Sequence, residues 1–147
     1  MAEYLLSDTT VVQYLTRASQ DSTAYQAMIG ERRLTISFQT QAELLSFPYG
    51  EKRRKRLDDL LAAMLKLPHT EATGIWYSRV FQVRTELKRR GQPGGDAGQA
   101  DIWVISSALE HGLAMLSHDK QQVHLGRAMN LKVLTNLPEL RDANPKL

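Results

Sequence analysis

The chain has 147 residues, of which 42% are hydrophobic, so we expect one ordinary domain with its own core over residues 1–147. It contains no cysteine, which excludes disulfide frameworks, thiolate metal sites and cysteine nucleophiles, and which fits a reducing cytoplasm. The 19 basic and 16 acidic residues give a formal net charge of +3. This mildly basic balance favours a polyanionic partner, although the same balance is common among soluble proteins in general.

The N-terminus lacks the features of an export signal. The chain begins Met1-Ala2-Glu3 and enters an apolar run at once, without a preceding basic region. No stretch approaches the roughly 20 consecutive apolar residues of a membrane span. We therefore expect a cytoplasmic protein that has no association with membranes.

The first third of the chain alternates apolar runs with helical stretches. Residues 4–6 predict a strand, and N-cap residues then precede a helix that begins near Val11. A second helical stretch at 22–32 leads into 34–38, whose β-branched and aromatic residues predict a buried strand. Glu43 lies on the helix that we expect next.

The middle of the chain is typical of two long helices. Apolar residues recur at helical spacing over 51–67, and Pro68 ends this stretch. Thr70 suits the N-cap of a further helix over 71–90. The glycine-rich stretch 91–98 then predicts a loop.

The last third again alternates helix and strand. Asp101 opens a predicted helix with apolar residues on one face, and Gly112 suits its C-terminal cap. Apolar runs at 113–116 and 131–134 predict two more strands. This alternation along the chain indicates an α/β fold with a mainly parallel sheet.

Four acidic residues recur where a predicted strand ends or a helix begins: Asp8, Glu43, Asp101 and Asp119. Sites in parallel sheets form beyond the carboxyl ends of the strands, so acids from these separate segments can converge. A desolvated cluster of carboxylates needs a compensating cation. Oxygen ligands without cysteine or a histidine pair favour magnesium, or manganese, over zinc. Such an ion lowers the pKa of an attacking water and stabilises charge on a phosphate.

Each acid also has an ordinary structural interpretation. Asp8 and Asp101 suit helix N-caps, Glu43 suits a solvated helix face, and Asp119 suits a turn. Asp96, in the glycine-rich loop, could assist or replace Asp101, although its glycine neighbours favour a solvent-exposed turn. The joint pattern supports a site more strongly than any one of these residues.

Read in order, the segments that carry the acids resemble the PIN domain, and within it the VapC-like toxins of bacterial toxin–antitoxin pairs. The resemblance runs almost from end to end. Four motifs carry it: YLLSDTTV at 4–11, ISFQTQAEL at 36–44, DIWV and ALEHGL at 101–104 and 108–113, and SHD at 117–119. Thr10 stands where asparagine is usual, and Ile105-Ser106 where two alanines are usual, but all four acids are present.

The resemblance implies a three-layer α/β/α fold with four to five strands in its central sheet. It also implies a magnesium-dependent endoribonuclease that cuts RNA, is silenced by a cognate antitoxin protein, and pairs as a homodimer. The metal-binding and catalytic residues would be the four acids, Asp8, Glu43, Asp101 and Asp119.

Two further features have more than one interpretation. The hydroxyl of Ser117 could orient a ligand or water, or could bond to local backbone. The basic run at 52–56 either contacts RNA or forms a solvated helix face. Its candidate RNA contacts are Arg53, Arg54, Lys55 and Arg56.

Three other functions compete with the nuclease. The first is a metal-free PIN-like domain that binds RNA or serves as a scaffold. The second is a phosphoacceptor receiver domain, which needs paired acids near its first strand, where this chain has Asp8 alone. The third is a small divalent-metal phosphatase, because the same acids could act on smaller phosphoesters.

Overall fold

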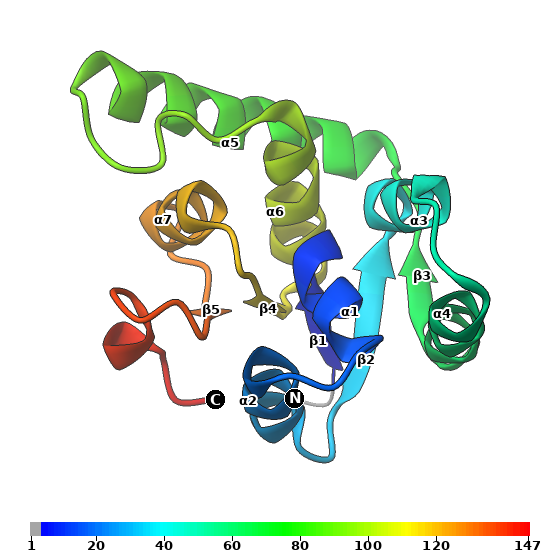
Figure 1. Ribbon diagram of the computed structural model, residues 1–147. Coiled ribbons are helices and arrows are strands. Elements are labelled where there is room, and N and C mark those ends of the chain that lie inside the picture. The colour runs from blue at the N-terminus through cyan, green and yellow to red at the C-terminus, as the bar shows by residue number, and fades with distance from the viewer. Residues whose placement is uncertain (1–3) are drawn as a thin grey trace.

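The computed structural model describes residues 4–147 (Figure 1); residues 1–3, which belong to the N-terminus expected to lack an export signal, lie outside the described residues. Over this range, five parallel strands form one sheet in the order β3-β2-β1-β4-β5. The strands are β1 (Tyr4–Ser7), β2 (Arg33–Ser37), β3 (Leu65–Leu67), β4 (Ala114–Leu116) and β5 (Val133–Leu134). The parallel α/β sheet predicted from the sequence is confirmed.

Helices cover both faces of the sheet (Figure 1). They are α1 (Thr9–Leu15), α2 (Gln20–Ile29), α3 (Phe38–Ser46), α4 (Glu51–Ala63), α5 (Glu71–Arg89), α6 (Gln99–His111) and α7 (Lys120–Ala128). Because side chains alternate between the two faces of a strand, neighbouring residues of β1 enter different cores. Leu5 packs against α1 and α2, and Leu6 packs against α5, α6 and α7. This arrangement confirms the three-layer α/β/α fold.

The strand order reverses beside β1, at the centre of the sheet. The chain first adds β2 and β3 on one side of β1, and later adds β4 and β5 on the other side. Ligands of open α/β sheets commonly bind in the crevice at such a reversal, beyond the carboxyl ends of the strands. Asp8 directly follows β1, and Asp119 follows β4 by a short connection, so both residues lie at this edge.

The predicted helix over 51–67 is wrong at its C-terminal end. Helix α4 ends at Ala63, Met64 has an extended backbone, and the next three residues form the edge strand β3. These residues pair with 35–37 of β2, and Leu67, with 8% of its surface exposed, joins the core beside Leu6. A short apolar run after a helix fits the helical repeat as well as the alternation of a strand. Here pairing with the open edge of β2 makes the run a strand.

Helix α7 was not assigned from the sequence. The carboxylate of Asp119 caps it by accepting the backbone N–H of Gln122. Two other predicted helix ends are confirmed: Thr70 caps α5, and Gly112 ends α6 in a left-handed conformation with φ of 63°. None of the helices over residues 4–147 has the length and apolar character needed to cross a membrane.

Candidate active site

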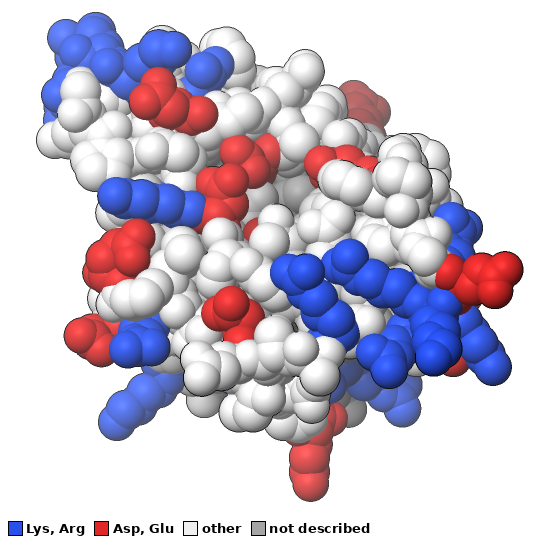
Figure 2. Space-filling view, viewed as in Figure 1, with Lys and Arg blue, Asp and Glu red and all other residues white. Residues whose placement is uncertain are grey.

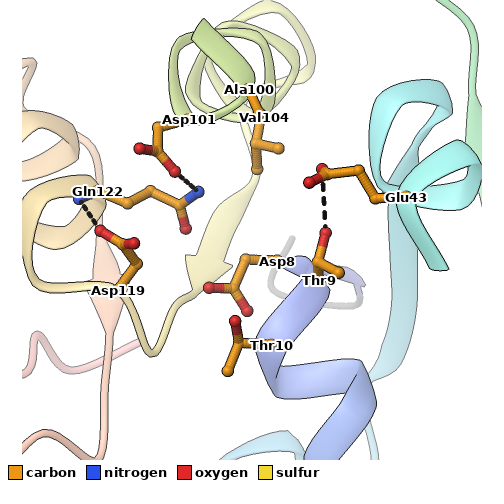
Figure 3. A pocket seen from close by; sticks show the side chains of 9 residues that line it. All are labelled: Asp8, Thr9, Thr10, Glu43, Ala100, Asp101, Val104, Asp119 and Gln122. Carbon is orange, nitrogen blue, oxygen red and sulfur yellow. Dashed lines mark hydrogen bonds between the residues drawn. The ribbon is translucent and has the colours of Figure 1, made fainter. Parts of the chain in front are cut away.

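A pocket of about 140 Å³ opens at the carboxyl edge of the sheet, and Figure 3 shows the side chains that line it. All four acids singled out in the sequence line this pocket. Asp8 and Asp119 come from the ends of β1 and β4, Glu43 from α3, and Asp101 from the first turn of α6. The remaining lining residues are Thr9, Thr10, Ala100, Val104 and Gln122. Segments far apart in the sequence therefore present carboxylates to one small space.

Asp8 is the most enclosed of these acids, with 3% of its surface exposed. Its Oδ1 accepts the backbone N–H of Val11 at 2.8 Å. Its Oδ2 accepts the hydroxyl of Ser117 at 3.1 Å and the backbone N–H of His118 at 3.0 Å. Burial raises the pKa of Asp8 to about 7, although these three donors favour the charged form and oppose the rise. Asp8 is thus both the N-cap of α1 and a wall of the pocket.

Gln122 connects the third and fourth acids. Its Nε2 donates to Oδ1 of Asp101 at 3.1 Å, and its backbone N–H donates to Oδ1 of Asp119 at 2.9 Å. The other oxygen of Asp101 accepts the backbone N–H of Gly98 at 2.8 Å. Burial, followed by the negative charge of Asp119, raises the pKa of Asp101 to about 6, and Glu43 adds to the rise. The two acids are therefore held by one glutamine while they repel each other.

Gln122 was missed in the sequence, as was Thr9, whose hydroxyl donates to Oε1 of Glu43 at 3.1 Å. The spacing of Gln122 offered a signal, because a glutamine three residues after a capping aspartate matches a helix capping box. Thr9 offered only its place directly after Asp8. Figure 3 shows both side chains holding a carboxylate at the edge of the pocket.

Ser117 contacts both a carboxylate of the pocket and local backbone. Its hydroxyl donates to Asp8, and its Oγ accepts the backbone N–H of Asp119 at 3.1 Å. The ring of His118 instead contacts Tyr25, with Nδ1 lying 2.6 Å from the tyrosine hydroxyl. His118 therefore contacts Asp8 through its backbone N–H, and its ring does not line the pocket.

Asp96 lies outside this pocket. It is exposed, and its carboxylate lies 3.9 Å from Nζ of Lys88 in a surface ion pair. The interpretation of Asp96 as part of a solvent-exposed turn fits these contacts, and Asp101 itself occupies the pocket.

The basic run of α4 divides into two groups. Arg53 and Arg56 turn toward the end of α1, where they donate to the hydroxyl and the carbonyl of Thr16 at 2.8 and 3.3 Å. Arg54 pairs with Asp58 at 3.1 Å, and Lys55 is exposed. None of the four lines the pocket of acids.

The residues of the pocket fit a hard divalent cation by their chemistry. The carboxylates of the pocket offer oxygen atoms as metal ligands, and oxygen ligands are those that Mg²⁺ and Mn²⁺ prefer. Oε1 of Gln122 adds a neutral oxygen that is buried and has no hydrogen-bond partner among residues 4–147. Such orphaned acceptors are uncommon and need an explanation, and a cation bound in the pocket would supply one.

The carboxylates face one another across the pocket without meeting at a point. Among residues 4–147, no three histidine, aspartate or glutamate side chains form a ready-made metal cluster. Figure 3 shows Glu43 on one side of the pocket and Asp101 and Asp119 on the other. Binding of a cation by all four acids would therefore need rotation of side chains toward the centre.

Solved structures share this fold at low sequence identity. A VapBC2 complex from Rickettsia felis, bound to a DNA fragment from its promoter, is 17% identical over 90% of this chain and 98% of that chain, with a TM-score of 0.68. FitAcB from Neisseria gonorrhoeae is 21% identical over 88% and 95%, with a TM-score of 0.66. VapBC-5 from Mycobacterium tuberculosis, a member of a family of toxin–antitoxin systems, is 22% identical over 90% and 97%, with a TM-score of 0.59.

A comparison with curated proteins gives no match. The family model of the PIN domain, in contrast, matches residues 5–128, which include all four acids. The resemblance noted in the sequence is confirmed by this match and by the shared fold. The chain belongs to the PIN domain family.

Proposed function

We propose that this protein is a metal-dependent endoribonuclease of the VapC type, the toxin of a toxin–antitoxin pair. It would hydrolyse RNA phosphodiester bonds with Mg²⁺, or alternatively Mn²⁺, as cofactor. The observation that carries the proposal is the gathering of Asp8, Glu43, Asp101 and Asp119 around one pocket at the reversal of strand order. The family match and the fold shared with VapBC complexes support it.

In this proposal the four carboxylates hold the cation, with Asp119 bound either directly or through water. When bound, the cation supplies positive charge to a scissile phosphate and acidifies a water molecule. The chain's own residues keep the ligands in place. Ser117 and the N–H of His118 fix Asp8, and Gln122 fixes Asp101. These bonds restrain Asp8 and Asp101 before any cation binds, although the side chains of the pocket would still rotate toward its centre to reach the cation.

We further propose a cognate antitoxin protein and a second copy of this chain as partners, and a cytoplasmic location. The solved neighbours described as VapBC complexes support the antitoxin partner. The reversible silencing of a nuclease by a second protein would protect the cell that makes it.

The test is incubation of the purified protein with total RNA in magnesium, in manganese and in EDTA. We expect cutting by the wild type in the presence of metal, and none in EDTA. Asp8→Ala and Asp101→Asn should both be inactive, because each removes a carboxylate of the pocket. Asp96→Asn is the matched control, since it removes an exposed carboxylate outside the pocket and should leave cutting unchanged.

Circular dichroism of each variant separates loss of the site from loss of the fold. Absence of cutting by the wild type in either metal would contradict the proposal, as would equal cutting by folded Asp101→Asn. Either result would favour the metal-free PIN-like domain that binds RNA or serves as a scaffold.

A further inference from the structure

A second groove, of about 380 Å³, lies beside the pocket of acids, and the two share Thr10. Its walls come from α1 and the residues just after it, from the connection between α3 and α4, and from the first turn of α4. The lining residues that matter here are Tyr14, Arg17, Phe47, Tyr49 and Arg53, which we call the arginine–tyrosine groove. Figure 2 shows lysine and arginine side chains gathered over α1 and α4, next to the carboxylates at the centre of the same face. A chain bound at the acids can therefore continue into a basic groove.

Each arginine of this groove lies against a tyrosine ring. The guanidinium of Arg17 is 5.2 Å from the ring centre of Tyr14, and that of Arg53 is 5.1 Å from the ring centre of Tyr49. The exposed ring of Phe47 adjoins Tyr49, with their centres 6.1 Å apart. A basic groove with flat aromatic surfaces is the combination by which proteins bind single-stranded nucleic acid, since phosphates meet cations and unpaired bases stack on rings.

Arg53 is held in position by its neighbours. Its Nε donates to Oγ1 of Thr16 at 2.8 Å, and its Nη2 donates to the carbonyl of Gln13 at 3.3 Å. The side chain of Gln13 in turn donates to the hydroxyl of Tyr49 at 3.3 Å. The bonds of Arg53 provide donors for acceptor groups at the C-terminal end of α1, which is a structural role. The same bonds also fix one wall of the groove before any ligand binds.

Arg17 has no comparable structural role. It is exposed, and within residues 4–147 neither Arg17 nor Arg53 forms an ion pair with a carboxylate. Arg54, on the same helix as Arg53, is by contrast paired with Asp58. Two uncompensated positive charges therefore lie on the groove that adjoins the acids, where an anionic ligand would be favoured.

We propose that the arginine–tyrosine groove binds single-stranded RNA next to the bond that is cut. Arg17 and Arg53 contact backbone phosphates, and an unpaired base stacks on Tyr49 or Tyr14. A base that takes the face of Tyr14 displaces the guanidinium of Arg17, which then meets the adjacent phosphate. The inference rests on the proposed ribonuclease function and specifies that the substrate is unpaired beside the cut.

The test is fluorescence anisotropy of a short, labelled, single-stranded RNA in EDTA, where binding is measured without cutting. We expect Arg17→Ala and Tyr49→Leu to weaken binding by about fivefold or more, given the size of stacking and phosphate contacts. Arg17→Ala should also reduce the slope of log affinity against log salt concentration by about 0.7, the value for one phosphate contact on a single strand.

Arg79→Ala is the matched control, because Arg79 lies 4.9 Å from the ring centre of Trp76 on α5 and lines neither pocket. It removes the same charge and the same kind of ring contact, and it should change affinity by less than about twofold. Arg17 is exposed and forms no hydrogen bond through its side chain within residues 4–147, so Arg17→Ala keeps the test valid even if Tyr49→Leu disturbs folding.

Equal affinity of Arg17→Ala and Arg79→Ala would overturn the inference and would assign the groove to a protein ligand such as an antitoxin segment. A wild-type protein that binds no RNA would also overturn the inference. Cutting is scored separately in magnesium. A wild type that binds through Arg17 but never cuts contradicts the proposed function alone, whereas one that cuts while Arg17→Ala binds normally overturns this inference alone.

Discussion

The hydroxyl of Ser117 donates to Oδ2 of Asp8 over 3.1 Å, and this bond joins the end of β4 to the end of β1. The same Oγ accepts the backbone N–H of Asp119. Ser117 is fully buried, so its hydroxyl cannot turn to water instead. One hydroxyl therefore holds the first acid of the pocket and the segment that carries the fourth.

Ser117→Ala should lower the free energy of unfolding by about 1–3 kcal/mol, because it removes one of the donors to the buried carboxylate of Asp8 and the acceptor of the part-buried N–H of Asp119. Urea unfolding at neutral pH measures this. Ser106→Ala is the matched control: Ser106 is equally buried, but its hydroxyl donates only to the helical carbonyl of Ile102. Its loss should have a clearly smaller effect, and equal losses for the two variants would contradict the role given to Ser117.

The pKa of Asp8 predicts how stability depends on pH in the absence of metal. Burial raises this pKa from 3.8 to about 7, so the folded state binds a proton that the unfolded state has already released. The resulting stabilisation is complete below about pH 4 and is lost as the pH rises through about 7. A shift of this size corresponds to roughly 4 kcal/mol. The raised pKa of Asp101 acts in the same direction.

We therefore expect the melting temperature of the wild type in EDTA to fall between about pH 5 and pH 8. Asp8→Asn removes the titrating carboxylate, and its one amide oxygen can still accept the N–H of Val11, so the melting temperature of this variant should change less with pH than that of the wild type. Asp96→Asn, at an exposed position, should follow the wild type. A wild-type melting temperature that rises over this range would refute the account of Asp8.

The parts of the fold that could be predicted from sequence depend on neighbours in the chain. Asp8 caps α1 through Val11, three residues away, and the strand before it shows in its own composition. The edge strand β3 could not be predicted, because residues 65–67 become a strand only by pairing with β2, some thirty residues earlier. Helix α7 begins with three polar residues, and its stability comes from packing against α5, α6 and β5.

The residues of the site likewise include some that could be predicted from sequence and some that could not. Asp8, Asp101 and Asp119 could be found because each ends or begins a local element, and parallel strands bring such ends together. Glu43 could be found because it lies in the second turn of α3, which directly follows β2. The bridge that Gln122 makes between Asp101 and Asp119 requires α6 and α7 to lie side by side. Only the folded chain brings this about, and so only the structure reveals the orphaned oxygen of Gln122.

Gln122→Glu tests whether this oxygen faces a cation. Without metal, the new carboxylate replaces a donor to Asp101 by a like charge, so we expect a lower melting temperature at about pH 8. With magnesium or manganese the added ligand should enlarge the metal-dependent rise in melting temperature beyond that of the wild type. Thermal shift assays in EDTA and in each metal measure both effects.

Gln121→Glu is the control for this variant. The neighbouring Gln121 lies outside the pocket of acids, and its Oε1 accepts the backbone N–H groups of Gly94 and Asp96, which a glutamate can also do. It adds the same charge one residue away. An equal metal-dependent shift for the two variants, or none for Gln122→Glu, would show that Oε1 of Gln122 does not face the cation.

The glycine-rich loop before α6 is packed against α5, and this positions Asp101. Gly94 and Gly95 are buried, and a Cβ added to Gly95 would lie 2.6 Å from both the N and the Cα of Lys88. Those atoms belong to the backbone of α5 and cannot turn aside. Because α6 begins four residues later, at Gln99, a displaced loop would carry Asp101 with it.

We therefore expect Gly95→Ala to lower the free energy of unfolding by about 1–3 kcal/mol, as overpacking does, and to reduce the metal-dependent rise in melting temperature because Asp101 moves. Gly74→Ala is the contrasting change: Gly74 lies within α5 with open space where its Cβ would stand, so alanine should stabilise the protein by up to about 1 kcal/mol. Urea unfolding and thermal shift in magnesium measure the two effects. A Gly95→Ala variant as stable and as responsive to metal as the wild type would mean that the loop yields without moving Asp101.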